Sequence, residues 1–104
     1  LSGVVIHGDT VYLAGHVVAD RSLGVKGQTE AILKRIDERL AEAGTDKSHL
    51  LSVTIYLADI ATFDEMNEAW DAWVDRASAP ARATVGAALA SPEYLVEISA
   101  IAAR

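Results

Sequence analysis

Short runs of β-branched and aromatic residues open the chain. Residues 4–6 and 10–14 are composed mainly of Val, Ile, Tyr and Leu, and they flank residues 7–9, which contain Gly and Asp. Gly and Asp tolerate the backbone conformations that tight turns require. The pattern therefore predicts a β-hairpin at the start of the chain.

Three further segments have the alternation or composition of strands. Residues 50–57 alternate with a period of two, with Leu51, Val53, Ile55 and Leu57 on one side and Ser52, Thr54 and Tyr56 on the other. We expect this strand to be half buried. Residues 81–89 and 94–102 predict the last two strands, joined by a turn at residues 90–93.

A helical period predicts an amphipathic helix over residues 25–43. Lys and Glu occupy the outer face, Gly44 provides a stop, and the apolar positions are Ala31, Ile32, Ile36, Leu40 and Ala43. A helix of this pattern packs its apolar stripe on a core.

A second helix is predicted after Thr62. Thr62 and Glu65 have the spacing of a capping box, in which a hydroxyl and a carboxylate satisfy free N–H groups of the first turn. The helix should bury Phe63, Met66, Trp70 and either Trp73 or Val74. The spacing of the tryptophans favours core packing over a ligand platform.

The element order is therefore ββαβαββ, an α+β fold with one mixed sheet and two helices packed on one face. The opposite face of the sheet would be uncovered. On the last strand one side is wholly apolar, with Val96, Ile98, Ala100 and Ala102, and the other is mixed, with Leu95, Glu97, Ser99 and Ile101. Since 104 residues cannot supply a second covering layer, we expect a symmetric homo-oligomer.

Composition narrows the functional classes. A chain of 104 residues, 51% of them hydrophobic, predicts a single domain over residues 1–104. A net charge of −6 opposes binding to nucleic acid, and the absence of cysteine excludes disulfides and thiolate chemistry. The three histidines have no metal-ligand spacing, so no metal site is expected. Without an apolar run long enough to span a membrane or a signal sequence, we expect a cytoplasmic protein.

Two charged residues in apolar surroundings are candidates for chemistry. Arg82 follows Pro80 at the start of a predicted strand, and Glu97 lies between Val96 and Ile98. Such residues are rarely buried unless they are paired or functional. A turn at residues 90–93 would place Glu97 opposite Val85 or its neighbour, several positions from Arg82. A structural ion pair, a subunit contact and a functional role all remain open.

Four segments resemble motifs of one known family, YjgF/RidA, and together span nearly the whole chain. They are Gly8–Gly15, similar to a G-x-x-hydrophobic-x-x-S-G hairpin; Ser52–Asp59, followed by Phe63 and Asn67; Pro80–Val85, similar to PAR-S/T-x-V; and Leu95–Ala102, similar to a closing VEIE-A-IA strand. The resemblance implies a chorismate-mutase-like fold and a homotrimer whose sheets form a barrel, with active sites in the clefts between subunits.

The resemblance also implies an activity, the cofactor-independent hydrolysis of reactive enamines and imines such as 2-aminoacrylate to 2-keto acids and ammonia. Arg82 would hold the substrate carboxylate with its planar guanidinium. Glu97 would orient the attacking water or act as its general base. The partner would then be a small imine, enamine or 2-keto acid.

Four other residues are candidate substrate contacts: Gly15, Ala14, Thr84 and Asn67. Asn67 matches a site position of the family, and a surface amide is the alternative for it. The backbone at Gly15 can approach a substrate closely, and the Thr84 hydroxyl would lie on the same strand face as Arg82. The chain departs from the family at Ala14, which replaces a serine, and at His16, which often is a glutamine. A carboxylate-binding regulatory trimer without turnover is the alternative function. A ribonuclease, an activity also attributed to the family, is disfavoured by the charge of −6.

Overall fold

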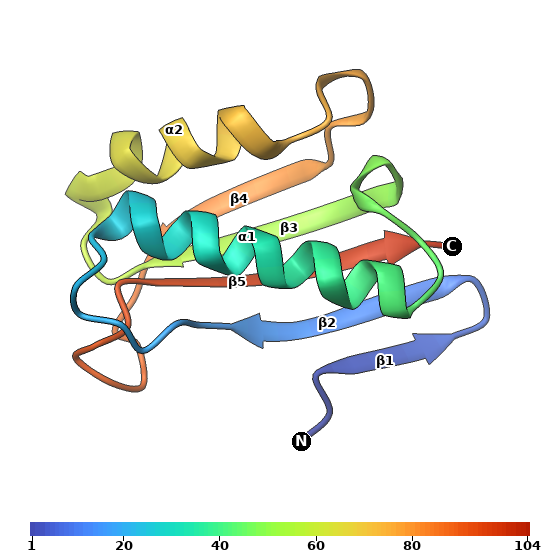
Figure 1. The fold of residues 1–104 in the computed structure, drawn as a ribbon, viewed down its shortest axis with the longest axis horizontal. Helices are drawn as coiled ribbons and strands as arrows, with labels where there is room; N and C mark the ends of the chain where they lie inside the picture. The colour runs from blue at the N-terminus through green and yellow to red at the C-terminus, as the bar shows by residue number, and fades with distance from the viewer.

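The computed structural model describes all 104 residues and contains the predicted order ββαβαββ. Three 3-10 turns, η1 Lys47–His49, η2 Ile60–Thr62 and η3 Arg76–Ser78, connect the larger elements. Figure 1 shows these elements, which are β1 Val4–His7, β2 Thr10–His16, α1 Val25–Glu42, β3 Leu50–Leu57, α2 Phe63–Trp73, β4 Ala81–Gly86 and β5 Val96–Ala103.

The strands form one mixed sheet in the order β1-β2-β5-β3-β4. The pairs β1–β2, β2–β5 and β3–β5 are antiparallel, and β3–β4 is parallel. The N-terminal hairpin is confirmed, with Gly8 at a φ of 59° in its turn. Only a residue without a Cβ adopts this conformation readily.

The last two strands do not form the expected hairpin. The segment β3–α2–β4 is a crossover unit whose helix returns the chain parallel to β3, so β4 pairs on the outer edge of β3. The inner edge of β3 is then free for β5, which lies between β2 and β3 (Figure 1). Residues 87–95 are therefore a loop that passes the end of β3. It contains a turn near the predicted place, where the Tyr94 N–H donates to the Ser91 carbonyl at 3.1 Å, but the strands on either side of this turn do not pair.

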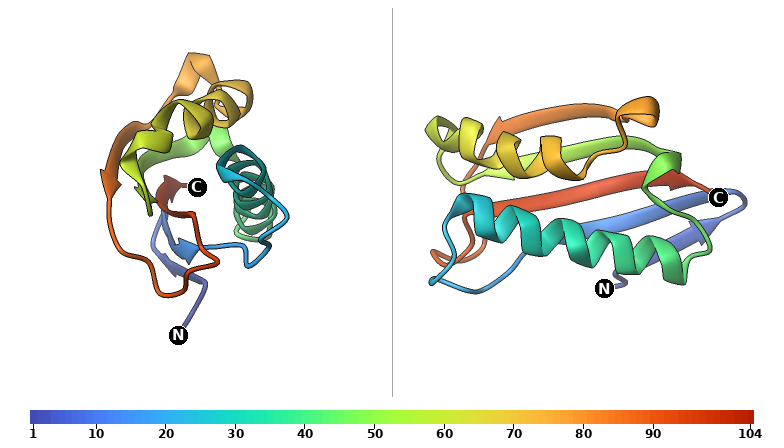
Figure 2. Two further views of the ribbon diagram at one scale, coloured as in Figure 1. Left: turned by 90° about the vertical axis from the view of Figure 1, so that its left-hand side faces the viewer. Right: turned by 45° about the horizontal axis from the view of Figure 1, so that its top comes forward.

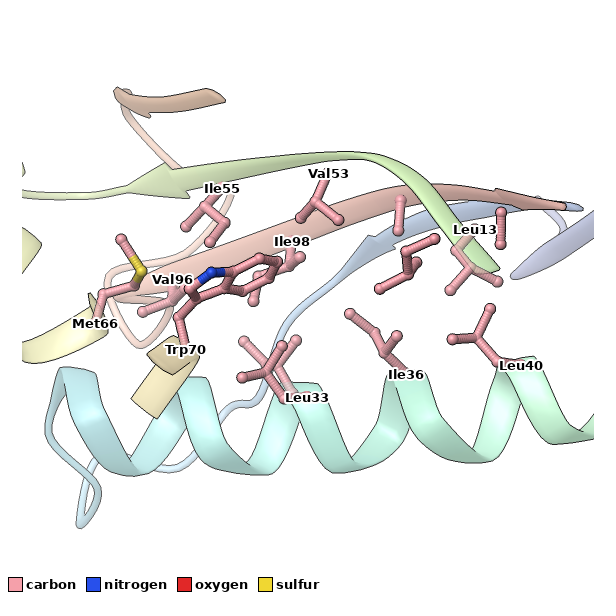
Figure 3. Close-up of a cluster of buried hydrophobic side chains, with 14 of the residues drawn as sticks. Leu13, Leu33, Ile36, Leu40, Val53, Ile55, Met66, Trp70, Val96 and Ile98 are labelled. Carbon is pink, nitrogen blue, oxygen red and sulfur yellow. The ribbon is translucent and has the colours of Figure 1, made fainter. Parts of the chain in front are cut away.

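Both helices lie on the same face of the sheet, as predicted (Figure 2). α1 covers the central strands, and α2 packs beside it. Between the helices and the sheet lies one apolar core, with fully buried side chains from each layer (Figure 3). Its members include Leu33, Ile36 and Leu40 from α1, Met66 and Trp70 from α2, and Val53, Ile55, Val96 and Ile98 from the sheet. Trp70 is thus a core residue, as predicted, and Trp73 is partly buried against the core.

Two local predictions are wrong. The pairing of β3 with β5 shifts in register between Leu50 and Ser52, which buries Leu50 and leaves Leu51 52% exposed. The capping box at the start of α2 does not form. Thr62 belongs to η2, so its hydroxyl donates back to the Asp59 carbonyl at 2.6 Å instead of accepting from the first helical turn.

The C-terminal end of α1 follows the prediction. Gly44 has a φ of 80°, the left-handed conformation that ends many helices. Its N–H donates to the Ala41 carbonyl at 3.0 Å. The chain can thus leave the helix within one residue and turn towards β3.

The second face of the sheet carries no helix (Figure 2). On β5 the residues Val96, Ile98, Ala100 and Ala102 are buried under the helices, and the alternate residues are partly exposed on the open face, as predicted. Exposed apolar side chains on this face include Val5, Tyr12 and Val85. A hollow of about 230 Å³ lies there, lined in part by Tyr12, Ser52, Thr54, Ser99 and Ile101. None of the helices has the length and apolar character needed to cross a membrane.

Candidate active site

Arg82 lies on the edge strand β4 and points to the helix face of the sheet. Its register partner on β3 is Val53, a core residue, so both side chains lie on the same face. The guanidinium carbon lies 5.5 Å from the ring centre of Phe63 and 5.1 Å from that of Trp70. Arginine binds such ring faces through their negative quadrupole. The aromatic pair therefore holds the cation at the open edge between β4 and α2.

The pKa of Arg82 is lowered from its ordinary value, chiefly because burial disfavours the charged form. The negative charge of Asp71 acts in the opposite direction. No carboxylate forms a salt bridge with this guanidinium. A partly desolvated arginine without an ion-pair partner is a strong site for a small anion.

Asn67 lies beside Arg82 and is hydrogen-bonded to it. Its Oδ1 accepts a hydrogen bond of 2.7 Å from Nη1 of Arg82, and its Nδ2 donates to Oδ2 of Asp71 at 3.3 Å. Within one chain, the amide thus orients the guanidinium. The remaining N–H groups of Arg82 are free for a ligand.

Thr84 lies on the same face of β4 as Arg82, as predicted. Its register partner is the core residue Ile55. The Thr84 hydroxyl oxygen is buried and has no hydrogen-bond partner. Buried polar groups are nearly always paired, so this hydroxyl is an exception on the strand face that carries Arg82. Arg82, Asn67, Asp71, Thr84, Phe63 and Trp70 are called the Arg82 cluster below.

Glu97 lies on the opposite, open face of the sheet. It follows the buried Val96 on β5 and pairs with Tyr56 of β3, so its side chain points away from the helices. The carboxylate packs directly against Gly15. A Cβ atom at Gly15 would lie 2.9 Å from Cδ of Glu97, a distance that real side chains essentially never show. Gly15 is therefore required for the position of this carboxylate.

A β-bulge brings Gly15 to this place. The pairing of β2 with β5 shifts in register between Leu13 and His16, which leaves an extra residue on β2. Bulges commonly redirect the chain next to functional sites. Glu97, Gly15, Ala14 and His16 are called the Glu97 cluster below.

The side chain of His16 contacts the main chain of Ala14. Nδ1 of His16 lies 2.6 Å from the Ala14 carbonyl oxygen, and the Ala14 N–H donates to Gly3. Because a carbonyl only accepts, Nδ1 of His16 is the donor in this contact. The methyl group of Ala14 provides no hydrogen-bonding group.

The two clusters lie on opposite faces of the sheet, and Arg82 and Glu97 form no ion pair within the chain. The simple salt-bridge interpretation of these two charges is wrong for a single chain. One face carries a partly buried arginine without an ion-pair partner, and the other carries a carboxylate packed against a glycine in a β-bulge.

Comparisons with known proteins place this fold and these residues in a family. A family model described as Endoribonuclease L-PSP matches residues 1–104. The chain belongs to the L-PSP (YjgF/RutC) family. A RutC family protein of Haemophilus ducreyi is 46% identical over 102 residues, which cover 98% of this chain and 87% of that protein.

Solved structures agree with the assignment to the L-PSP family. A YjgF family member from Neisseria meningitidis has a TM-score of 0.96 at 42% identity, covering 100% of this chain and 87% of that one. RidA from the Antarctic bacterium Psychrobacter has a TM-score of 0.91 at 28% identity, covering 100% and 88%. The predicted resemblance and the YjgF-like fold are both confirmed.

Three members of the Arg82 cluster were not predicted as site residues. Phe63 and Trp70 were assigned to the core alone, although they also contact the guanidinium. Asp71 was not singled out. Its spacing of four residues from Asn67 on a helix was the available signal, because residues at that spacing share one face.

Proposed function

We propose that this L-PSP family protein hydrolyses enamines and imines of the 2-aminoacrylate type to 2-keto acids and ammonia. The observation that carries the proposal is the partly desolvated Arg82, which has no carboxylate partner and whose strand face also carries Thr84. The free N–H groups of its guanidinium suit a small carboxylate. The name RidA of one structural neighbour is consistent with this activity.

The active site would form between two copies of the chain. Arg82 and Glu97 lie on opposite faces, so one chain cannot present both to one small substrate. The open face carries exposed apolar side chains that a second copy would cover. We therefore propose a homotrimer in which the Arg82 cluster of one subunit meets the Glu97 cluster of the next.

Hydrolysis would proceed in two steps. Arg82 binds the substrate carboxylate and fixes the imine carbon beside Glu97. An enamine first takes up a proton from solvent at its β-carbon, which gives the iminium form. Glu97 then accepts a proton from water as the water oxygen bonds to the iminium carbon, which gives a carbinolamine. Glu97 returns that proton to the nitrogen, ammonia leaves, and the hydroxyl group releases its proton to solvent as the carbonyl forms, so that one water yields one keto acid and one ammonia.

The test combines catalysis with subunit mixing. A serine or threonine dehydratase generates the enamine, and the release of keto acid is followed with and without the protein. Arg82→Ala and Glu97→Gln should each abolish the acceleration. When the two inactive variants are unfolded together and refolded as mixed trimers, about a quarter of the interfaces pair an intact Arg82 with an intact Glu97. We expect about a quarter of the wild-type rate; no recovery would exclude a site shared between copies.

The alternative is a carboxylate-binding trimer without turnover. Ala14 favours it, since this position offers no hydroxyl to a substrate. Binding of pyruvate without any acceleration of hydrolysis would identify it. Ribonuclease activity is named in the description of the family model, but the charge of −6 disfavours RNA binding.

A further inference from the structure

Gln28 is a buried polar residue outside both clusters. It lies on the core side of α1 between Val25 and Ile32, and its exposed fraction is 0%. Fully buried glutamines are uncommon, and each polar atom that stays unpaired there is costly. A buried amide among apolar side chains therefore needs hydrogen-bond partners for both its N–H groups and its oxygen.

Its partners are main-chain groups of two loops. Nε2 donates to the carbonyl of Asp20 at 3.2 Å and to the carbonyl of Glu93 at 3.0 Å. Oε1 accepts from the N–H of Leu95 at 3.0 Å. The side chain thus binds residues 17–24, which follow β2, to residues 87–95, which precede β5.

These loops adjoin the two strands of the Glu97 cluster. Leu95 is two residues before Glu97, and its carbonyl accepts from the N–H of Ala58 at 3.0 Å. On the other side, the loop after β2 begins next to His16. The exposed pair Arg21–Glu93 also joins the loops, but its atoms are 3.9 Å apart, and such surface pairs contribute little.

We propose that Gln28 is a positioning residue that sets the place of Glu97 against the Gly15 bulge. The proposal rests on the function proposed above. By binding the entry of β5 and the exit of β2 with one rigid amide, Gln28 limits the sliding of these strands relative to each other at the point where the carboxylate meets the glycine. Reactive geometry is sensitive on this scale, because a displacement of about 1 Å can cost about 100-fold in rate.

Thr29 provides a matched control for a purely structural effect. It is also on α1, also has an exposed fraction of 0%, and its hydroxyl donates to the Val25 carbonyl of the same helix at 2.7 Å. Thr29→Val removes a buried hydrogen bond that joins no loop. It should lower stability without moving Glu97.

The experiment compares Gln28→Met, which keeps the shape of the side chain, with Thr29→Val. Gln28→Asn is the second variant, because it keeps an amide that is one methylene too short to reach both loops. We expect kcat to fall about 100-fold in Gln28→Met with KM within about twofold, because Arg82 lies on other elements. Thr29→Val should keep both constants within about twofold. A folded Gln28→Met protein with wild-type kcat would overturn the proposal.

A second readout separates this proposal from the proposed function. The amide and side-chain carboxyl ¹³C chemical shifts of Glu97 should change in Gln28→Met and Gln28→Asn but not in Thr29→Val. Hydrogen exchange at the Leu95 amide should become faster in the same two variants. If the wild-type protein is inactive, the function fails on its own, and unchanged Glu97 shifts in every variant would then refute the positioning role.

Discussion

The replacement Gly15→Ala tests the Glu97 cluster with a single methyl group. The backbone at Gly15 has no positive φ, so alanine is compatible with its conformation. The new Cβ would instead collide with the end of the Glu97 side chain. The variant therefore changes the position of the carboxylate and little else.

The size of the displacement follows from the contact distances. Carbon atoms in contact lie about 3.5 to 4.0 Å apart, so Cδ of Glu97, at 2.9 Å from the new Cβ, must move about 1 Å. The clashing atoms are the mobile end of a side chain, and an altered rotamer costs about 1 kcal/mol. A displacement of about 1 Å should lower kcat/KM about 100-fold, or about 2.7 kcal/mol of transition-state stabilisation.

The assay is the coupled release of keto acid, measured together with thermal unfolding. Gly3→Ala is the control, because no atom lies within 4 Å of its Cβ position. In a Glu97→Ala background, Gly15→Ala should have no further effect, since the group it displaces is absent. A Gly15→Ala protein with kcat/KM within about twofold of the wild type would refute this account of the Glu97 position.

Three further predictions concern the core, the acid stability and the Arg82 cluster. Ile36→Ala leaves a cavity under α1 and should cost about 3 kcal/mol in chemical unfolding; a loss under about 1 kcal/mol would contradict full burial. The hydroxyl and amide of Ser48 lower the pKa of Asp46, so their contribution is present above the ordinary value of 3.8 and is lost as pH falls through the lower folded value. Ser48→Ala should therefore lower Tm at pH 7, and the difference from wild type should vanish in strong acid; a constant difference would contradict the linkage. Asn67→Leu removes the acceptor that orients Arg82, and calorimetry should show pyruvate binding weakened about tenfold. An unchanged affinity for pyruvate would show that Arg82 does not need the hydrogen bond from its guanidinium to Asn67.

Local patterns were sufficient to predict most elements. The helical stripe of α1 and the stop at Gly44 depend on residues close in sequence, and both were predicted correctly. The prediction failed at Thr62, because its hydroxyl could bond either to the first turn of α2 or to a residue a few positions earlier in the sequence. The 3-10 turn before α2 brings the hydroxyl to the Asp59 carbonyl.

Non-local pairing was the part that the sequence left open. The insertion of β5 between β2 and β3 depends on which edge of β3 is free after β4 has paired. The hydrophobic periodicity of the sequence does not predict which strands pair. Leu51 illustrates the same limit, since the register shift beside Leu50 leaves it 52% exposed. The types of the candidate residues Arg82 and Glu97 could be selected from the sequence, but their placement on opposite faces required the sheet order.

The separation of Arg82 and Glu97 by the thickness of the sheet has a consequence for how activity would depend on protein concentration. In the proposed assembly, a free chain would hold half of each of two different sites and no complete one. Dilution below the dissociation constant of the assembly would therefore remove activity while every chain stays folded. The rate per chain would rise with concentration and then level off, so the catalytic measurement itself would report how tightly the copies associate.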